Sequence, residues 1–329
     1  MLYEFANALT RRGHEVHFVH APQWSESVAT ADEIPFQFEA GVRHYFVDRV
    51  DDPIVPPVDV FFGGSGSQRG HPAVIVQGFR LLGPKWDAAV YRTPSPKVCV
   101  ASWLVDVGRS YGVPEHQLTY VPVGLDHELF AMRTPAAHRT LDVAMLYHPA
   151  REKGWDVGRQ VLFELTRRNP GLRATVISLA DPPADPPPDG VPLVALPQRE
   201  LADDIYNQTK VFVQASHHEG LGLTAIEAMA CGAALVTTDC GGSRDYAVAD
   251  ETALVVPAGD VHALVARTES LLADEERRSR LAVNASAYVR KFDWAVSGRL
   301  LEDFLESYVA DPDSYQNPPS EDRSAEFVL

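Results

Sequence analysis

The stretch HHEGLGLTAIEAMACG, residues 217–232, places two carboxylates in a glycine-rich setting that holds no other formal charge. Glu219 precedes a turn with Gly220 and Gly222, and seven residues separate it from Glu227. Ionised carboxylate oxygens accept hydrogen bonds from hydroxyl groups such as those of sugars and ribose. The two glutamates therefore indicate a ligand rich in hydroxyl groups.

The elements around this stretch predict a phosphate site between the two carboxylates. The apolar run 211–216 predicts a buried strand, and residues 224–231 predict a helix closed by Gly232. Free N–H groups and the helix dipole at a helix start favour phosphate, and glycines let the backbone approach it closely. Because carboxylates repel phosphate, the glutamates need other partners. A diphosphate flanked by hydroxyl groups describes a nucleotide sugar.

The whole chain reads as two α/β domains. Its 329 residues exceed what one hydrophobic core usually serves. Short runs rich in Val, Ile and Leu alternate with amphipathic helical patterns, as in doubly wound, Rossmann-like domains with buried parallel sheets. A strand-like run meets Pro122 and Gly124, so we predict a first domain over 1–124 and a second over 125–292. The tail 311–329, rich in Pro, Ser, Asp and Glu, predicts disorder.

Composition excludes several kinds of partner. A net charge of -16 argues against a nucleic-acid partner or a broad anionic-membrane surface. No apolar run approaches the roughly 20 residues of a membrane span, so we predict a cytoplasmic protein with at most peripheral membrane contact. The cysteines, Cys99, Cys231 and Cys240, lack CxxC spacing and predict reduced thiols. The adjacent His217 and His218 predict packing or acceptor contacts, with metal ligation as the alternative.

Residues 214–242 resemble the E-x7-E signature of retaining GT-B glycosyltransferases, in particular glycosyltransferase family 4. The matching positions are Ser216, Glu219, Gly220, Glu227, Ala228, Met229, Gly232, Gly241, Gly242 and Asp245. Three further pieces follow the family's order: VPVGLDHELF (121–130), AREKG (150–154) and KFDW (291–294). The resemblance implies a GT-B fold, in which two Rossmann-like domains face a cleft and a helix over 293–310 crosses back to the first domain.

The resemblance also implies catalytic roles. Glu219 would contact the donor sugar's hydroxyl groups near the reacting carbon, and Glu227 would hold the ribose hydroxyl groups. Lys153, with Arg151, would neutralise the diphosphate as it leaves, which stabilises developing charge. Cationic side chains and a helix end would then replace a divalent ion, so the resemblance implies no metal and no cofactor beyond the nucleoside-diphosphate sugar donor.

Further donor contacts follow from the same resemblance. Backbone groups of the loop and the helix start would bind the diphosphate, and these residues are Gly220, Gly222, Leu223 and Thr224. The family's arginine usually lies five or six residues before its lysine, and His148 holds the position five before Lys153. Either His148 or Arg151 would therefore take the arginine's part.

Each of the main candidates has an ordinary structural interpretation as well. Thr224 to Glu227 fit a capping box, in which the glutamate bonds back to the first turn of its helix. Glu219 taken alone fits a solvated loop acid, and Lys153 taken alone fits a surface lysine. The match to the family favours the functional interpretation over these alternatives.

Two departures from the family affect the first domain. The chain opens on an amphipathic helix over 2–12, so we expect this domain to lack its usual first strand and glycine-rich loop. Where many members place a histidine and a small residue, Gln77 and Gly78 follow the strand-like run 72–76 and are the candidates on the acceptor side. Glutamine can hydrogen bond to a hydroxyl group but cannot shuttle a proton. The glycine-rich segment 63–70 either lines the cleft or is a surface loop.

The resemblance predicts a retaining glycosyltransferase that moves a sugar from a nucleoside-diphosphate sugar to an acceptor hydroxyl of a glycan, lipid or small molecule. The alternative is a catalytically silent nucleotide-sugar-binding protein or partner subunit, favoured by the missing first strand and by Gln77. A GT-B-fold nucleotide-sugar epimerase is a third interpretation, which the E-x7-E pattern disfavours.

Overall fold

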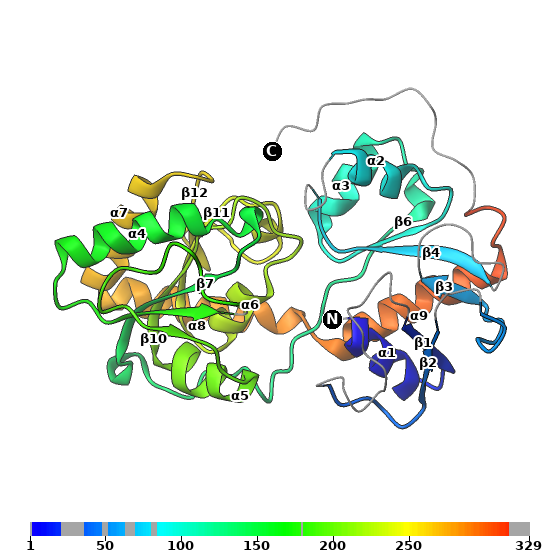
Figure 1. Ribbon diagram of the computed structural model, residues 1–329, viewed down its shortest axis with the longest axis horizontal. Coiled ribbons are helices and arrows are strands. Elements are labelled where there is room, and N and C mark those ends of the chain that lie inside the picture. Colours follow the sequence, from blue (N-terminus) through cyan, green and yellow to red (C-terminus); the bar gives the residue numbers. More distant parts are fainter. Residues whose placement is uncertain are drawn as a thin grey trace. The chain divides into compact units, whose positions relative to one another are not determined.

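The computed structural model describes residues 2–20, 36–47, 52–62, 70–79, 84–178 and 180–315 (Figure 1). The chain divides into two compact units. Unit 1 comprises Met1–Gln77, Leu82–Gly124 and Phe292–Val328, and unit 2 comprises Gly78–Leu81 and Leu125–Lys291. The predictions for most of the segment 63–70 and for residues 316–329 of the tail lie outside the described residues.

Unit 1 contains two sets of parallel strands. Its elements are α1 (Leu2–Arg11), β1 (Val16–His20), β2 (Val42–Phe46), β3 (Val60–Phe62), β4 (His71–Val76), α2 (Pro84–Arg92), β5 (Lys97–Cys99), α3 (Ser102–Ser110), β6 (Leu118–Tyr120) and α9 (Trp294–Ala310). β1 pairs with β2, and the other strands form a sheet in the order β3-β4-β5-β6. Every described pairing in unit 1 is parallel, and the helices α2 and α3 lie in the connections from β4 to β5 and from β5 to β6.

The core of unit 1 is built from both ends of the described chain. Apolar residues of α1 and α9 pack with residues of the sheet in one buried cluster: Phe5, Leu9, Ala73, Val98, Val121, Leu301, Phe304 and Tyr308. Gly298 allows the close approach of the two helices, because a Cβ added there would lie 3.2 Å from the Cβ of Ala8. The Tyr308 hydroxyl also donates to the Pro72 carbonyl at 2.8 Å. Helix α9 is therefore an integral part of unit 1 (Figure 1).

Unit 2 contains one six-stranded parallel sheet with the order β12-β11-β10-β7-β8-β9. Its elements are β7 (Leu141–Tyr147), α4 (Trp155–Arg168), β8 (Ala174–Ser178), β9 (Leu193–Val194), α5 (Gln198–Glu200), β10 (Thr209–Gln214), α6 (Leu223–Ala230), β11 (Ala234–Thr238), β12 (Ala253–Val256), α7 (Val261–Ala273) and α8 (Glu275–Tyr288). The apolar side chains of the central strands and of α4 form the main core of this unit. The Val- and Leu-rich runs form strands because both faces of this sheet are covered.

The strand order of unit 2 reverses between β7 and β10. From β7 the chain runs outward through β8 and β9, and from β10 it runs the other way through β11 and β12. The two strands are in register, with Val211 opposite Val143 and Phe212 opposite Ala144. In open α/β sheets, ligands bind outside the carboxyl ends of the strands at such a reversal. The strand order therefore predicts a ligand site at the loops that follow β7 and β10.

Across the described ranges, none of the helices has both the length and the apolar character that a membrane span requires.

Candidate functional site

The loops after β7 and β10 are joined to each other by their backbones. The N–H groups of His217 and His218 both donate to the carbonyl of Glu152, at 2.8 and 3.1 Å. Gly154 has a positive φ of 66° and packs so closely on Ala215 that a Cβ would overlap the Ala215 carbonyl. This close approach requires glycine. The two loops consequently form one structural unit at the edge of the sheet.

An ion pair connects Lys153 and Glu219, two of the three side chains predicted to be catalytic. Lys153 Nζ lies 2.8 Å from Glu219 Oε2, and the hydroxyl of Ser216 donates to Glu219 Oε1 at 2.9 Å. Glu219 is only 4% exposed, so it is not a solvated loop acid. Lys153 is held against this carboxylate and is not an isolated surface lysine. Burying such a pair costs desolvation energy, and charged groups buried at the edge of a sheet are candidates for function.

The segment after β11 supports the loop that carries Glu219. The N–H of Glu219 donates to the Cys240 carbonyl at 2.8 Å, and the N–H of Gly242 donates back to the Glu219 carbonyl at 3.2 Å. A Cβ on Gly242 would lie 2.7 Å from the carbonyl oxygen of Gly220, so a side chain there would displace this loop. The glycine pair 241–242 thus fixes the backbone on both sides of Glu219.

Helix α6 begins one residue earlier than the sequence predicts, and this excludes the capping box that was the alternative interpretation of Glu227. Its N-cap is Gly222, with a φ of 99° and no side-chain capping bond. Thr224 is then the second residue of the helix and cannot form the box with Glu227. A Cβ on Gly222 would lie 3.1 Å from Gln214 Nε2 and also close to the Tyr246 hydroxyl. The first N–H groups of a helix lack acceptors within it, so the start of α6 offers donors and a positive dipole end.

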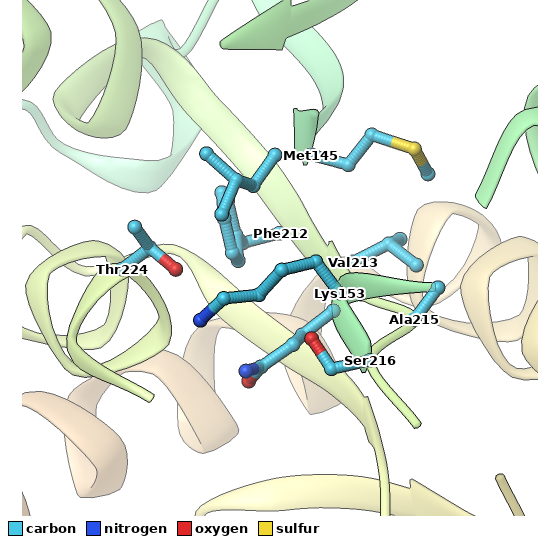
Figure 2. Close-up of a pocket in the computed structure, with 9 residues that line it drawn as sticks. Met145, Lys153, Phe212, Val213, Ala215, Ser216 and Thr224 are labelled. Carbon is cyan, nitrogen blue, oxygen red and sulfur yellow. The ribbon is translucent and has the colours of Figure 1, made fainter. Parts of the chain in front are cut away.

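A small pocket of about 10 Å³, room for about one water molecule, lies beside the ion pair (Figure 2). Its lining comes from β7, β10, the loops after them and the first turn of α6: Met145, Leu146, Lys153, Phe212, Val213, Gln214, Ala215, Ser216 and Thr224. In Figure 2 the amine of Lys153 extends toward Thr224. An amine, two hydroxyl groups and an amide therefore line one pocket, a polar set suited to ligand oxygens.

Glu227 has a different partner from the one its sequence context suggests. The hydroxyl of Tyr206 donates to Glu227 Oε2 at 2.9 Å. Burial raises the pKa of Glu227 to about 7, while the hydrogen bond from Tyr206 favours the charged form and opposes that rise. Glu227 remains partly exposed, whereas Tyr206 is fully buried.

The raised pKa of Glu227 predicts that Glu227→Gln stabilises the unliganded protein at pH 8. The folded pKa of about 7 lies above the ordinary 4.5, so the stability contributed by protonation is lost as pH rises through 7. The loss is at most about 3–4 kcal/mol, because each pKa unit is worth about 1.4 kcal/mol. Urea unfolding should show the variant more stable at pH 8 and similar to wild type at pH 4. Exposed Glu251→Gln serves as the control, and an equal difference at both pH values would contradict the prediction.

The other predicted site residues lie around this centre with fewer contacts. His148 Nδ1 accepts from the N–H of Ala150 at 3.1 Å, which shapes the loop after β7, and Arg151 is exposed. Within the described residues, neither is hydrogen bonded to Glu219. Gln77 is exposed directly after β4 in unit 1, and Gly78 follows it. Their part on the acceptor side stays a prediction.

Sequence reasoning missed two residues that contact the predicted carboxylates. Ser216 matched the family pattern, and its position three residues before Glu219 was a usable signal for the hydrogen bond between them. Tyr206 gave no such signal, because strand β10 separates it from Glu227 in the sequence. The ring of His217 lies 3.1 Å from Asp156 Oδ1. In the parts of the chain that are described, no group of three or more His, Cys, Asp or Glu side chains could hold a metal ion.

The chain is similar to known proteins in sequence and in structure. The family model "Glycosyl transferases group 1" matches residues 194–288. D-inositol 3-phosphate glycosyltransferase of Xylanimonas cellulosilytica is 40% identical over 97 residues, which cover 30% of this chain and 23% of that protein. The capsular polysaccharide biosynthesis glycosyltransferase CapM of Staphylococcus aureus is 32% identical over 114 residues, 34% of this chain and 30% of that protein. The matches span less than a third of these two relatives' own lengths.

Solved structures match over more of the chain. Sucrose-phosphate synthase from Thermosynechococcus elongatus superposes with a TM-score of 0.74 at 16% identity, covering 94% of this chain and 92% of that one. A glycosyltransferase from Rickettsia africae gives a TM-score of 0.70 at 14% identity, covering 94% and 93%. Anabaena HepE in complex with UDP and glucose gives 0.59 at 14% identity, covering 73% and 72%. These similarities confirm the predicted GT-B fold of two Rossmann-like, parallel-sheet domains.

Proposed function

Because the chain belongs to the glycosyl transferases group 1 family, the retaining GT-B enzymes of glycosyltransferase family 4, we propose that it transfers a sugar from a nucleoside-diphosphate sugar to an acceptor hydroxyl with retention of anomeric configuration. The observation that carries the proposal is the Lys153–Glu219 ion pair at the strand-order reversal of unit 2. It supplies a cation and a carboxylate side by side, as a sugar joined to a diphosphate requires. A relative of the same fold, Anabaena HepE, is known in complex with UDP-glucose.

In the proposed reaction Lys153 exchanges partners. Its amine leaves Glu219 for the diphosphate and takes up the negative charge that grows as the bond between the sugar's anomeric carbon and the diphosphate oxygen breaks. A bond forms between that carbon and the acceptor oxygen, and the acceptor's proton passes to the departing diphosphate. Glu219, still held by Ser216, accepts hydrogen bonds from the sugar's hydroxyl groups.

We assign binding of the donor's diphosphate to the start of α6 and binding of its ribose to the middle of that helix. The loop and helix start, Gly220, Gly222, Leu223 and Thr224, direct backbone N–H groups and a positive dipole end at the diphosphate. Glu227 accepts from the ribose hydroxyl groups, and Arg151 or His148 adds a further contact beside Lys153. Lys153 and the helix end would thus do the work for which other enzymes use a divalent ion.

A catalytically silent nucleotide-sugar-binding protein is the second candidate, because Gln77 cannot shuttle a proton. The absence of the usual first strand from the first domain stays a prediction. The bounds of the two domains (1–124 and 125–292), of the crossing helix (293–310) and of the tail (311–329) also stay predictions. A cytoplasmic location, at most peripheral contact with a membrane and no nucleic-acid partner also belong to the proposal. The acceptor is assigned no further than a hydroxyl group.

The direct test is incubation of the protein with a panel of UDP-, GDP- and TDP-sugars. Release of nucleoside diphosphate, with a product of the donor's own anomeric configuration by NMR, is the expected result. Calorimetric binding of a donor without turnover would favour the silent binding protein instead. A protein that neither binds nor turns over any donor of the panel would refute the proposal.

A further inference from the structure

Tyr206 contacts the carboxylate that we assign to ribose. It begins the short turn Tyr206–Gln208 directly before β10, is 0% exposed, and donates from its hydroxyl to Glu227 Oε2 at 2.9 Å. We propose that Tyr206 is a positioning residue that holds Glu227 for recognition of the 2′ and 3′ hydroxyl groups of the donor's ribose. This inference rests on the proposed function, because it assumes that a nucleotide occupies the site.

The hydrogen bond leaves half of the carboxylate available to a ligand. Oε2 of Glu227 is taken by Tyr206, and within the described part of the chain no hydrogen bond or ion pair to Oε1 is present. Glu227 is partly exposed, so a ligand hydroxyl can reach it. A carboxylate fixed through one oxygen presents the other in a single orientation, which reduces the entropy lost when a ligand binds.

The tyrosine ring is itself held in place. Its centroid lies 6.2 Å from that of Phe130 and 5.8 Å from that of Phe212 on β10. A fully buried ring between two aromatic neighbours has few alternative rotamers. The orientation of the hydroxyl at its tip is therefore set by the core of unit 2 and does not depend on the ligand.

A buried arginine joins the tyrosine's turn to the helix that carries Glu227. Arg139 is 4% exposed, and its guanidinium donates to the carbonyl of Tyr206 at 3.1 Å and to the carbonyl of Cys231 at 2.6 Å. Cys231 is the C-cap of α6. The two sides of the Tyr206–Glu227 hydrogen bond are thus held at a fixed separation by both their side chains and their backbones.

The hydrogen bond also favours the charge state that ribose recognition needs. Burial disfavours the ionised form of Glu227, and no cation contacts this carboxylate in the described residues. The tyrosine hydroxyl opposes the effect of burial by donating to the carboxylate. Without that donor the pKa of Glu227 would rise further, and the protonated group would lose acceptor capacity at neutral pH.

The test measures binding of UDP and GDP, and of their 2′-deoxy and 3′-deoxy forms, by calorimetry between pH 6 and 9. Wild type should prefer the ribonucleotide, and this preference should fall as pH drops through about 7. Tyr206→Phe should weaken ribonucleotide binding about tenfold, as expected for loss of a hydrogen bond to a charged group. It should change binding of the deoxynucleotides little, and it should raise the pH at which half of the preference for the ribonucleotide is lost. The double variant Tyr206→Phe, Glu227→Gln should bind the ribonucleotides no more weakly than Glu227→Gln alone.

The matched control is Tyr246→Phe. Tyr246 is the other fully buried tyrosine of unit 2 whose hydroxyl donates to a side chain, here Gln214 Oε1 at 2.7 Å, and it should keep the ribose preference. Equal behaviour of the two variants, or an unchanged preference and pH profile in Tyr206→Phe, would overturn the inference. Failure of wild type to bind any of these nucleotides would instead count against the proposed function.

Discussion

Replacing Glu219 with glutamine should abolish sugar transfer, with a loss of more than about 100-fold in kcat. The amide keeps the shape of the side chain and can still bond to Ser216, but it loses the negative charge that accepts from the sugar's hydroxyl groups beside the reacting carbon. The affinity for the nucleoside diphosphate, in contrast, should not fall. With Glu219 neutral, Lys153 no longer has to leave an anionic partner 2.8 Å away, so UDP or GDP should bind as tightly as to wild type or more tightly.

The matched control for this variant is Asp142→Asn. Asp142 also holds a lysine, Lys210, at 2.7 Å, and its carboxylate is likewise largely buried, with its side chain 16% exposed. This pair lies at the amino ends of β7 and β10, whereas the Lys153–Glu219 pair follows their carboxyl ends. Asp142→Asn should lower stability and leave kcat nearly unchanged. Normal turnover in Glu219→Gln, measured as release of nucleoside diphosphate, would remove Glu219 from the reaction.

Replacing Lys153 with alanine should reduce kcat about 100- to 1000-fold, the usual effect of removing one preorganised group that stabilises developing charge. Unlike the glutamate variant, this change should also weaken nucleoside-diphosphate binding, because the charge that meets the diphosphate is gone. It leaves Glu219 buried beside Ser216 without its cation, so the free energy of unfolding should also fall. Steady-state kinetics and calorimetry with UDP and GDP separate these effects.

Lys210→Ala is the control for the lysine variant. The Lys210 side chain is 24% exposed and that of Lys153 is 28% exposed, so the two removals cost similar packing. Asp142 still keeps Arg173, whose N–H donates to Oδ2 at 2.9 Å and whose guanidinium lies 3.6 Å from it. Lys210→Ala should therefore lower stability by no more than Lys153→Ala does, without a loss of turnover. If both variants lost activity equally, general destabilisation would explain the result and Lys153 would have no catalytic role.

Much of the fold could be predicted from the sequence because the strands of parallel sheets are continuous apolar runs. The apolar segments 15–20, 58–64, 72–78 and 97–102 each predict a strand. β1, β3 and β5 lie within three of them, and β4 begins one residue before its segment, at His71. β2 was missed because Arg43 and His44 interrupt its apolar pattern. Pairing of distant strands and the strand order depend on tertiary packing, which local pattern does not encode.

The candidate site was predictable as a set of residue types and less so as a set of contacts. Motif and strand position placed Lys153 and Glu219 at the same edge of a sheet, although 66 positions separate them. The alternative interpretation of Glu227 as part of a capping box does not hold, because the left-handed Gly222 starts the helix one residue earlier, where Gln214 and Tyr246 leave no room for a side chain. Helix periodicity cannot reveal such a close approach.

The position of α9 in unit 1 has a consequence for the order in which the chain folds as it leaves the ribosome. Leu301, Phe304 and Tyr308 complete the core of unit 1, yet they are synthesised after the whole of Leu125–Lys291. At about 5–20 residues per second, the earlier part of unit 1 waits roughly 10–40 s for this helix. Unit 2, which is almost one uninterrupted stretch, can fold within that interval. The usual order, in which the amino-terminal domain folds first, is therefore reversed, and the early strands of unit 1 depend on protection from aggregation until the last helix arrives.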